Sequence, residues 1–176
     1  AYNTTIGGSV SIFSDRATTG PGIVHTLGTL SIGNSTLFSY LGLNVDDGLG
    51  GLTFGATTFT AATPVFDVSN GGMNVILGAL SGNFAFNKAG GGQLTLNTAS
   101  ARTGGTATLQ DGVMRLGNAS ALGTAAVPLQ LNGGTLDLST NTTINAYNTT
   151  VGGDVTIMSN RATAGAGITH VLGTLS

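Results

Sequence analysis

Short runs in which apolar and polar residues alternate recur along the chain, about every eight to twelve residues. Clear examples are residues 9–12, 94–96, 106–109, 113–116, 129–131, 135–138 and 155–157. Side chains two positions apart on a strand share a face, so each run predicts a short strand with one buried face. We therefore expect Leu94 and Leu96 to point inward while Thr95 meets solvent, and Asp137 to lie outside between two buried leucines.

Glycine-rich turns separate these runs. They include Asn70-Gly71-Gly72, Asp111-Gly112 and Asn132-Gly133-Gly134, and glycine supplies the positive φ that tight turns require. Two architectures share this pattern. The turns can join antiparallel hairpins into a sandwich or barrel, or they can wind the strands into a parallel β-helix, in which each strand stacks on its equivalent one coil later.

A long internal repeat favours one of these architectures. Residues 1–31 recur as residues 146–176, with 22 identities in 31 positions and no gap. This pattern predicts one complete repeat unit over 1–145 and the start of the next over 146–176, within a longer tandem array. Tandem repetition with few aromatic residues favours the parallel β-helix, whose narrow interior small aliphatic residues can fill. With coils of roughly 20 to 30 residues, one unit would hold about five to seven.

The fold expected is therefore all-β, a right-handed parallel β-helix (β-solenoid) built from tandem repeats. Strand alternation predicts that two equivalent sets are buried, namely Ile6, Val10 and Ile12 and then Val151, Val155 and Ile157. Three pairs of repeat equivalents should occupy matching environments, except where an end lacks its neighbour: Tyr2 and Tyr147, His25 and His170, Arg16 and Arg161.

Composition supports this fold and excludes several classes of protein. Gly, Thr, Asn and Ser fill 85 of 176 positions, charged residues make up 7%, no Glu is present and Lys88 is the only lysine. Such a chain cannot build long amphipathic helices. The net charge of −2 gives no basic stripe for nucleic acid, and the lack of cysteine excludes disulfides and thiolate metal sites. No run is long enough for a transmembrane helix.

The stretch from Phe86 to Leu138 resembles the autotransporter-associated β-strand repeat of giant bacterial surface proteins. The residues that match its pattern are Lys88, Gly90, Gly92, Leu94, Leu96, Gly104, Gly105, Thr106, Gly112, Leu116, Gly117, Ala121, Leu122, Gly123 and Leu131 to Leu136. Val113-Met114 departs mildly from it. The resemblance implies a parallel β-helix exported to the cell surface or beyond, and it implies no catalytic residues.

The chemically interesting residues each have a plain structural interpretation. Asp46-Asp47-Gly48 is the only acidic pair and is expected to form a turn, since it lacks the spacing of a calcium-binding β-roll. Arg16 and Arg161 are expected to bind a turn carbonyl or a neighbouring unit, and His25 and His170 to be surface or wedge residues.

The remaining acids are scattered, at Asp67, Asp111, Asp137 and Asp154. Polysaccharide cleavage would need two or three converging carboxylates. No catalytic, cofactor-binding or metal-binding residue is predicted, and we expect the protein not to be an enzyme.

The first functional hypothesis is a structural extracellular segment that forms a fibre, stalk or sheath on a bacterial surface. Its expected partners are copies of itself, end to end and laterally, and cell-surface or matrix components. The second is an adhesin that binds glycan or a host protein, although the chain has no Trp and 6% aromatic residues. The third, a β-helical enzyme acting on polysaccharide, lacks the carboxylate cluster.

Overall fold

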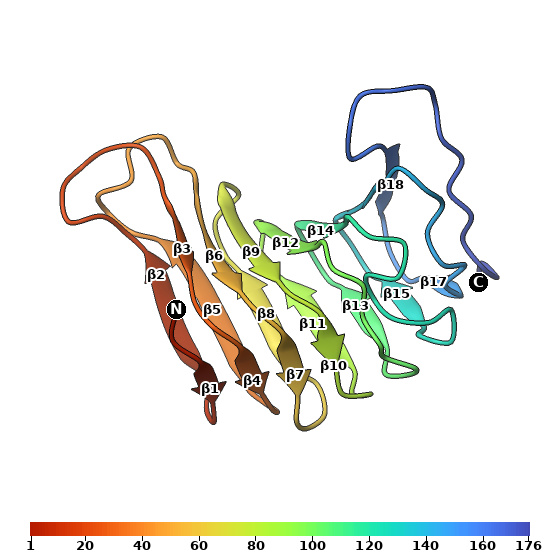
Figure 1. The fold of residues 1–176 in the computed structure, drawn as a ribbon, viewed down its shortest axis with the longest axis horizontal. Coiled ribbons are helices and arrows are strands. Elements are labelled where there is room, and N and C mark those ends of the chain that lie inside the picture. The colour runs from red at the N-terminus through yellow and green to blue at the C-terminus, as the bar shows by residue number, and fades with distance from the viewer.

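The computed structural model describes residues 1–176 and contains eighteen β-strands and no helix (Figure 1). Sheet 1 has four strands, in the order β1 (Thr4–Ile6), β4 (Leu30–Ile32), β7 (Thr57–Phe59) and β10 (Leu80–Ser81). Sheet 2 has seven strands, in the order β2 (Val10–Ser14), β5 (Thr36–Leu41), β8 (Val65–Val68), β11 (Phe86–Ala89), β13 (Ala107–Leu109), β15 (Leu129–Leu131) and β17 (Thr149–Val151). Sheet 3 has seven strands, in the order β3 (Val24–Thr26), β6 (Gly50–Phe54), β9 (Met73–Leu77), β12 (Gln93–Leu96), β14 (Val113–Leu116), β16 (Thr135–Ser139) and β18 (Thr156–Asn160).

The chain visits the three sheets in turn and winds into a β-solenoid of about seven turns. Every pair of neighbouring strands is parallel, for example β5 with β8 and β12 with β14. Paired residues lie between 19 and 29 positions apart in the sequence, as with Asn74 and Gln93 at the lower limit and Leu37 and Phe66 at the upper. The predicted parallel β-solenoid, and its coil length, are confirmed.

The interior is one continuous cluster of 29 buried apolar residues. Inward side chains stack in rows from coil to coil, and one row in sheet 3 follows Leu52, Val75, Leu94, Met114 and Leu136. The predicted inward leucines of β12 and β16 are all buried. Each row forms because every second side chain of a strand points inward, and the strands of successive coils pair in register, inward residue beside inward residue.

The expectation of a purely aliphatic interior is wrong. Phe54, Phe59, Phe66 and Phe86 are all buried, and the last three pack against one another with ring centroids 5.3 to 6.1 Å apart. They lie in coils that have a strand on all three sides.

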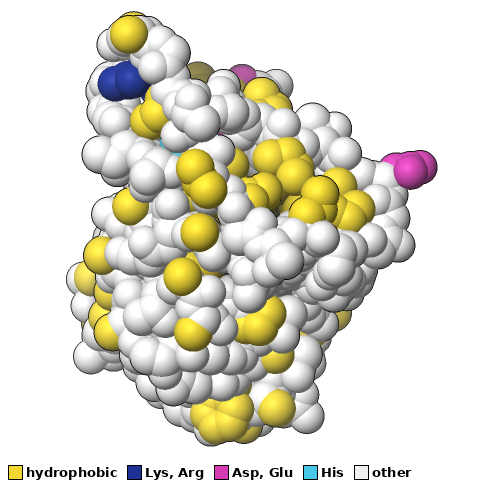
Figure 2. All heavy atoms as spheres, turned by 90° about the vertical axis from the view of Figure 1, so that its right-hand side faces the viewer, with side chains coloured by type: hydrophobic (Ala, Val, Ile, Leu, Met, Phe, Trp, Pro, Cys, Tyr) yellow, Lys and Arg dark blue, Asp and Glu magenta, His cyan; other side chains and the backbone are white.

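The burial predicted for the two end coils is also wrong in part. Ile6 is buried, but Val10, Val151 and Ile157 are exposed, and Ile12 and Val155 are only partly buried. An inward side chain needs a coil on both sides to be covered, and each end coil has a neighbour on one side only. Figure 2 shows hydrophobic side chains lying open at the C-terminal end of the solenoid.

Sheet 1 stops after β10, and in the later coils its side is formed by the loops 97–106, 117–128 and 140–148. The two copies of the repeated segment are also offset by one side. The first copy places β1 in sheet 1 and β2 in sheet 2, whereas the second places the equivalent β17 in sheet 2 and β18 in sheet 3. The 145-residue unit therefore winds through six turns and one further side, within the predicted number of coils.

Candidate functional site

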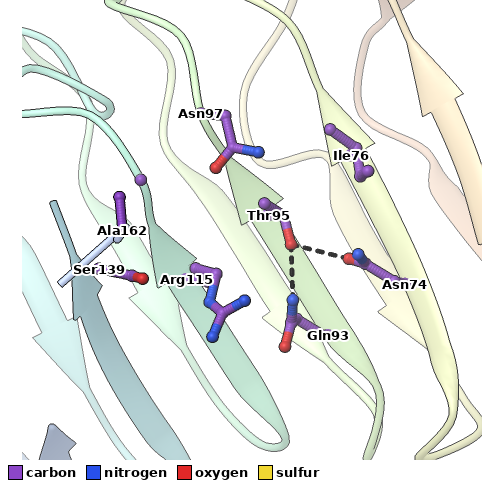
Figure 3. Close-up of a pocket in the computed structure, with 9 residues that line it drawn as sticks. Asn74, Ile76, Gln93, Thr95, Asn97, Arg115, Ser139 and Ala162 are labelled. Carbon is purple, nitrogen blue, oxygen red and sulfur yellow. Dashed lines mark hydrogen bonds between the residues drawn. The ribbon is translucent and has the colours of Figure 1, made fainter. Parts of the chain in front are cut away.

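A polar groove of about 340 Å³ crosses the outer face of sheet 3 (Figure 3). Its lining comes from the four consecutive strands β9, β12, β14 and β16 and from residues just after β12, β14 and β18: Asn74, Ile76, Gln93, Thr95, Asn97, Arg115, Gly117, Ser139 and Ala162. These residues meet because outward positions of successive coils stack in register. A side chain at Gly117 would overlap Asn97 Oδ1, so glycine there leaves room for the asparagine.

Two hydrogen bonds, one within β12 and one between coils, organise one wall of the groove. Gln93 Nε2 donates to Thr95 Oγ1 at 2.8 Å, and Thr95 Oγ1 donates to Asn74 Oδ1 at 2.8 Å. The outward direction of Thr95 agrees with the sequence prediction, but the side chain is buried and does not meet solvent. Longer polar side chains from the same and the preceding coil cover it, which strand alternation alone does not reveal.

Asp137, on β16, departs from the prediction in the same way. Its Oδ2 accepts a hydrogen bond from Arg115 Nε at 2.7 Å and its Oδ1 accepts one from Asn160 Nδ2 at 2.8 Å. The aspartate is 5% exposed, whereas the Arg115 side chain is 41% exposed. Both carboxylate oxygens are therefore used within the protein, and the outer guanidinium nitrogens of Arg115 are free to donate to a hydroxyl or carboxylate in the groove.

The acidic pair forms the predicted turn. Gly48 has a φ of 67°, and Asp47 Oδ1 accepts the N–H groups of Leu49 and Gly22, each at 2.9 Å. These two donors, that of Leu49 first, hold the pKa of Asp47 below its usual value. Because Gly22 belongs to the preceding coil, Asp47 joins two coils.

The other acids do not converge. Asp67 accepts from Ser69 Oγ at 2.8 Å and Asp111 from the N–H of Gly112 at 2.7 Å, while Asp154 is exposed. No three His or Asp side chains lie together as a metal site would require. No carboxylate lines the groove, and the nearest one shown is Asp137, which is paired with the lining residue Arg115. The expectation that the protein is not an enzyme stays a prediction.

The paired histidines and arginines occupy the matching local environments that the repeat predicts. His25 Nε2 lies 2.9 Å from the carbonyl oxygen of Asp15, and His170 Nε2 lies 3.0 Å from that of Asn160. Arg16 Nη1 donates to Pro21 O and Arg161 Nη1 to Ala166 O, both at 2.8 Å. These arginines therefore bind turn carbonyls, as predicted.

Sequence reasoning missed that Lys88 is an interior residue. It lies on β11 in an inward row between Phe66 and Leu109, and its Nζ donates to the carbonyl oxygens of Ala89, Gly90 and Asp111 at 2.6 to 3.0 Å. Burial lowers the pKa of Lys88 from 10.5 to about 8. The signal was present in the sequence, since Lys88 is two residues from the inward Phe86 and shares its face.

Arg102 is a second buried cation that the sequence did not single out. It lies in the loop that follows the end of sheet 1, and its guanidinium donates to five carbonyl oxygens, those of Gly82, Phe84, Gly104, Gly105 and Leu122. It also lies 5.2 Å from the ring centroids of both Phe59 and Phe86, a cation–π geometry. Burial lowers the pKa of Arg102 to about 10, so it stays charged at neutral pH. Arg102 joins three coils where strand pairing is absent.

Comparison with known proteins does not assign the chain to a family. No family model, no curated protein and no solved structure matches the chain. The resemblance to the autotransporter-associated repeat therefore stays a prediction. The structure has no helix that is long and apolar enough to cross a membrane.

Proposed function

We propose that the chain is a structural segment of an extracellular β-solenoid, one that stacks end to end into a fibre, stalk or sheath on a bacterial surface. The observation that supports this proposal most is parallel pairing that runs unbroken along sheets 2 and 3 through about seven turns, with a single core along the whole length. A solenoid of this kind extends by adding coils and needs no change to its interior. The resemblance over Phe86 to Leu138 supports export to the surface.

The chemistry of the surface also suits a structural role. The chain carries five basic and seven acidic residues, of which Lys88, Arg102 and Asp137 are buried. A polar, weakly charged surface lets neighbouring solenoids approach with little repulsion. This supports lateral packing of copies, or contact with matrix components, as the second mode of association.

Electron microscopy of the purified chain tests the proposal, together with fibre diffraction of aligned material. We expect rods that lengthen with protein concentration, and a reflection near 4.8 Å along the rod axis, since strands stack in that direction. Single particles that stay the same length at every concentration would contradict the proposal.

The groove on sheet 3 supports an adhesin as a second candidate function. Its amide, hydroxyl and guanidinium groups can bind the hydroxyl or carboxylate groups of a glycan, although it lacks the aromatic platform common in sugar sites. A glycan array would test it. We expect Arg115→Gln, which can still donate to Asp137, to weaken any acidic-glycan binding about tenfold, and Arg161→Gln, outside the groove, to leave it unchanged. No binding to any glycan would remove this candidate.

A further inference from the structure

Two asparagines of the chain, Asn70 and Asn132, each begin an Asn-Gly-Gly tripeptide. The backbone nitrogen of a glycine can attack the side-chain amide of the asparagine before it, because glycine has no Cβ to hinder the approach and its backbone is permissive. Both asparagines are exposed, and both lie in turns that lead from sheet 2 to sheet 3. They share a local sequence and differ in their surroundings.

The turn around Asn70 is open. It spans residues 69–72, between β8 and β9. A Cβ at Gly71 would meet nothing within 4 Å, and the N–H of Gly71 donates to no group of the protein. Asn70 Oδ1 accepts the N–H of Leu41, from the preceding coil, at 3.2 Å. That donor is placed to stabilise negative charge on the amide oxygen, while the amide nitrogen of Asn70 is held by no hydrogen bond.

The turn around Asn132 is closed. It spans residues 132–134, between β15 and β16, and is one residue shorter. Asn132 Nδ2 donates to Gln110 Oε1 at 3.2 Å, and Asn132 Oδ1 accepts from Gln130 Nε2 at 2.8 Å. A Cβ at Gly133 would lie 2.6 Å from the carbonyl oxygen of Gln110. The preceding coil therefore holds both the amide nitrogen and the glycine backbone that would have to approach it.

We propose that Asn70 is a modification site, at which the folded chain converts its own asparagine into isoaspartate and aspartate, and that the fold protects Asn132 from the same reaction. The reaction needs water alone, so it is independent of the proposed assembly. Open space at Gly71 lets its nitrogen reach Cγ of Asn70, and the free amide nitrogen can leave.

The reaction has two steps. The nitrogen of Gly71 loses its proton to water and bonds to Cγ of Asn70, and the bond from Cγ to Nδ2 breaks, so that ammonia leaves with a proton from water. Water then hydrolyses the five-membered imide. Cleavage at Cγ gives aspartate, whereas cleavage at the backbone carbonyl carbon gives isoaspartate, whose chain runs through Cγ and is one methylene longer. Water is consumed and ammonia released, and nothing is oxidised or reduced.

Isoaspartate at this position would disturb a turn that is fixed on two sides. The carbonyl oxygen of Asn70 accepts the N–H of Met73, which begins β9, at 2.9 Å. Gly92 of the following coil packs against the same oxygen, since a Cβ there would lie 2.4 Å from it. Isoaspartate turns this carbonyl into a free carboxylate outside the main chain, whereas aspartate leaves the backbone as it is. We therefore expect isoaspartate alone to loosen β9.

Peptide mapping of the full chain, aged at mildly alkaline pH, tests the proposal. Exchange of ammonia for water changes the peptide mass, and isoaspartyl methyltransferase labels isoaspartate but not aspartate. In the folded chain Asn70 should convert about ten times or more faster than Asn132. In urea the two should convert at nearly equal rates, because their tripeptides are identical. Equal rates in the folded chain would overturn the proposal, and so would a difference that persists in urea.

Two variants separate the local sequence from the surroundings. Gly71→Ala places its methyl group in open space, so the fold should be kept, and it should slow conversion of Asn70 about tenfold or more because a Cβ hinders the attack. Gln110→Ala frees the amide nitrogen of Asn132 and should speed conversion there several-fold. Unchanged rates in both variants would overturn the proposal.

Asn70→Asp is the matched control for the structural consequence. Amide hydrogen exchange in β9 should accelerate in the isoaspartate fraction of the aged chain and should stay unchanged in Asn70→Asp. Equal exchange in the isoaspartate fraction and the fresh chain would overturn the expected loosening of β9.

Discussion

Residues 1–31 and 146–176 have nearly the same sequence and quite different surroundings. Bonds made within a coil are the same in both copies. The side chain of Asn3 accepts the N–H of Thr29 at 3.0 Å, and that of Asn148 accepts the N–H of Thr174 at 3.0 Å. The histidine and arginine contacts agree as closely.

Burial follows a different rule. Tyr2 and Tyr147 differ completely in exposure although their local sequences are alike. β3 (Val24–Thr26) pairs with a following coil, whereas its equivalent, residues 169–171, lies at the open end and forms no strand. Local sequence therefore determines how a coil is bent, and the neighbouring coil determines which of its residues are buried and which form strands.

Substitution of Tyr2 and Tyr147 should give the largest difference between what the local sequence determines and what the neighbouring coil determines. Tyr147→Ala removes a fully buried ring and should cost the last coil about 3 to 5 kcal/mol. Amide hydrogen exchange in β17 should then accelerate about 100-fold or more. Tyr2→Ala should change exchange in β1 by less than about threefold, since exposed sites contribute little. Similar effects from both variants would show that the comparison is wrong.

The paired glycines should give the next largest difference. Gly22→Ala forces a methyl group against the backbone of Leu49 and should cost about 1 to 3 kcal/mol in the free energy of unfolding. Gly167→Ala, the same change in open space, should stay within about 0.5 kcal/mol. Urea denaturation of the two variants measures this, and equal midpoints would contradict it.

Lys88 should make stability depend on pH, because burial lowers its pKa in the folded chain. Unlike Arg16 and Arg161, which bind only their own turns, it also binds a carbonyl in the next coil. Its folded pKa of about 8 lies below the unfolded value of 10.5, so the unfolded chain holds more protons between these limits. The free energy of unfolding should therefore rise with pH from about 8 to 10.5, by at most about 1.4 kcal/mol per pH unit. Lys88→Met should flatten this slope, and an unchanged slope would exclude Lys88 as its source.

Arg16→Ala and Arg161→Ala should have the smallest effects and nearly equal ones. Each removes hydrogen bonds confined to one exposed turn, so about 0.5 kcal/mol is expected in both cases. Proteolytic nicking at the two turns provides a local measure. A large difference between the variants would mean that one turn depends on a neighbouring coil.

The sequence predicted features that depend on one coil and missed those that depend on several. Leu94 and Leu96 were correctly predicted to point inward, because the alternation of inward and outward side chains along a strand depends only on neighbouring residues. The burial of Thr95 and Asp137 was not predictable in this way, because their covering groups lie about twenty residues away in other coils. Arg102 is the extreme case, since its five acceptors belong to three coils and no local pattern marks it.

The candidate site follows the same division. Turn formation at Asp47 and carbonyl binding by Arg16 were predictable from local residue types. The groove on sheet 3 was not, because it exists only once outward side chains from four coils are in register. That register depends on coil lengths of 19 to 22 residues in this part of the chain, which turn signals place only to within a few residues.

The two copies are offset by one side of the solenoid, and this offset sets how far each unit in an array is rotated about the solenoid axis relative to the unit before it. Since 145 residues make six turns and one further side, each unit faces a direction one side away from the unit before it, and a fourth unit faces the same way as the first. At about 4.8 Å per turn the rise is roughly 30 Å per unit. A filament of such units would present its grooves as a screw with a period of roughly 90 Å, so that a flat surface alongside it would meet one groove in every three.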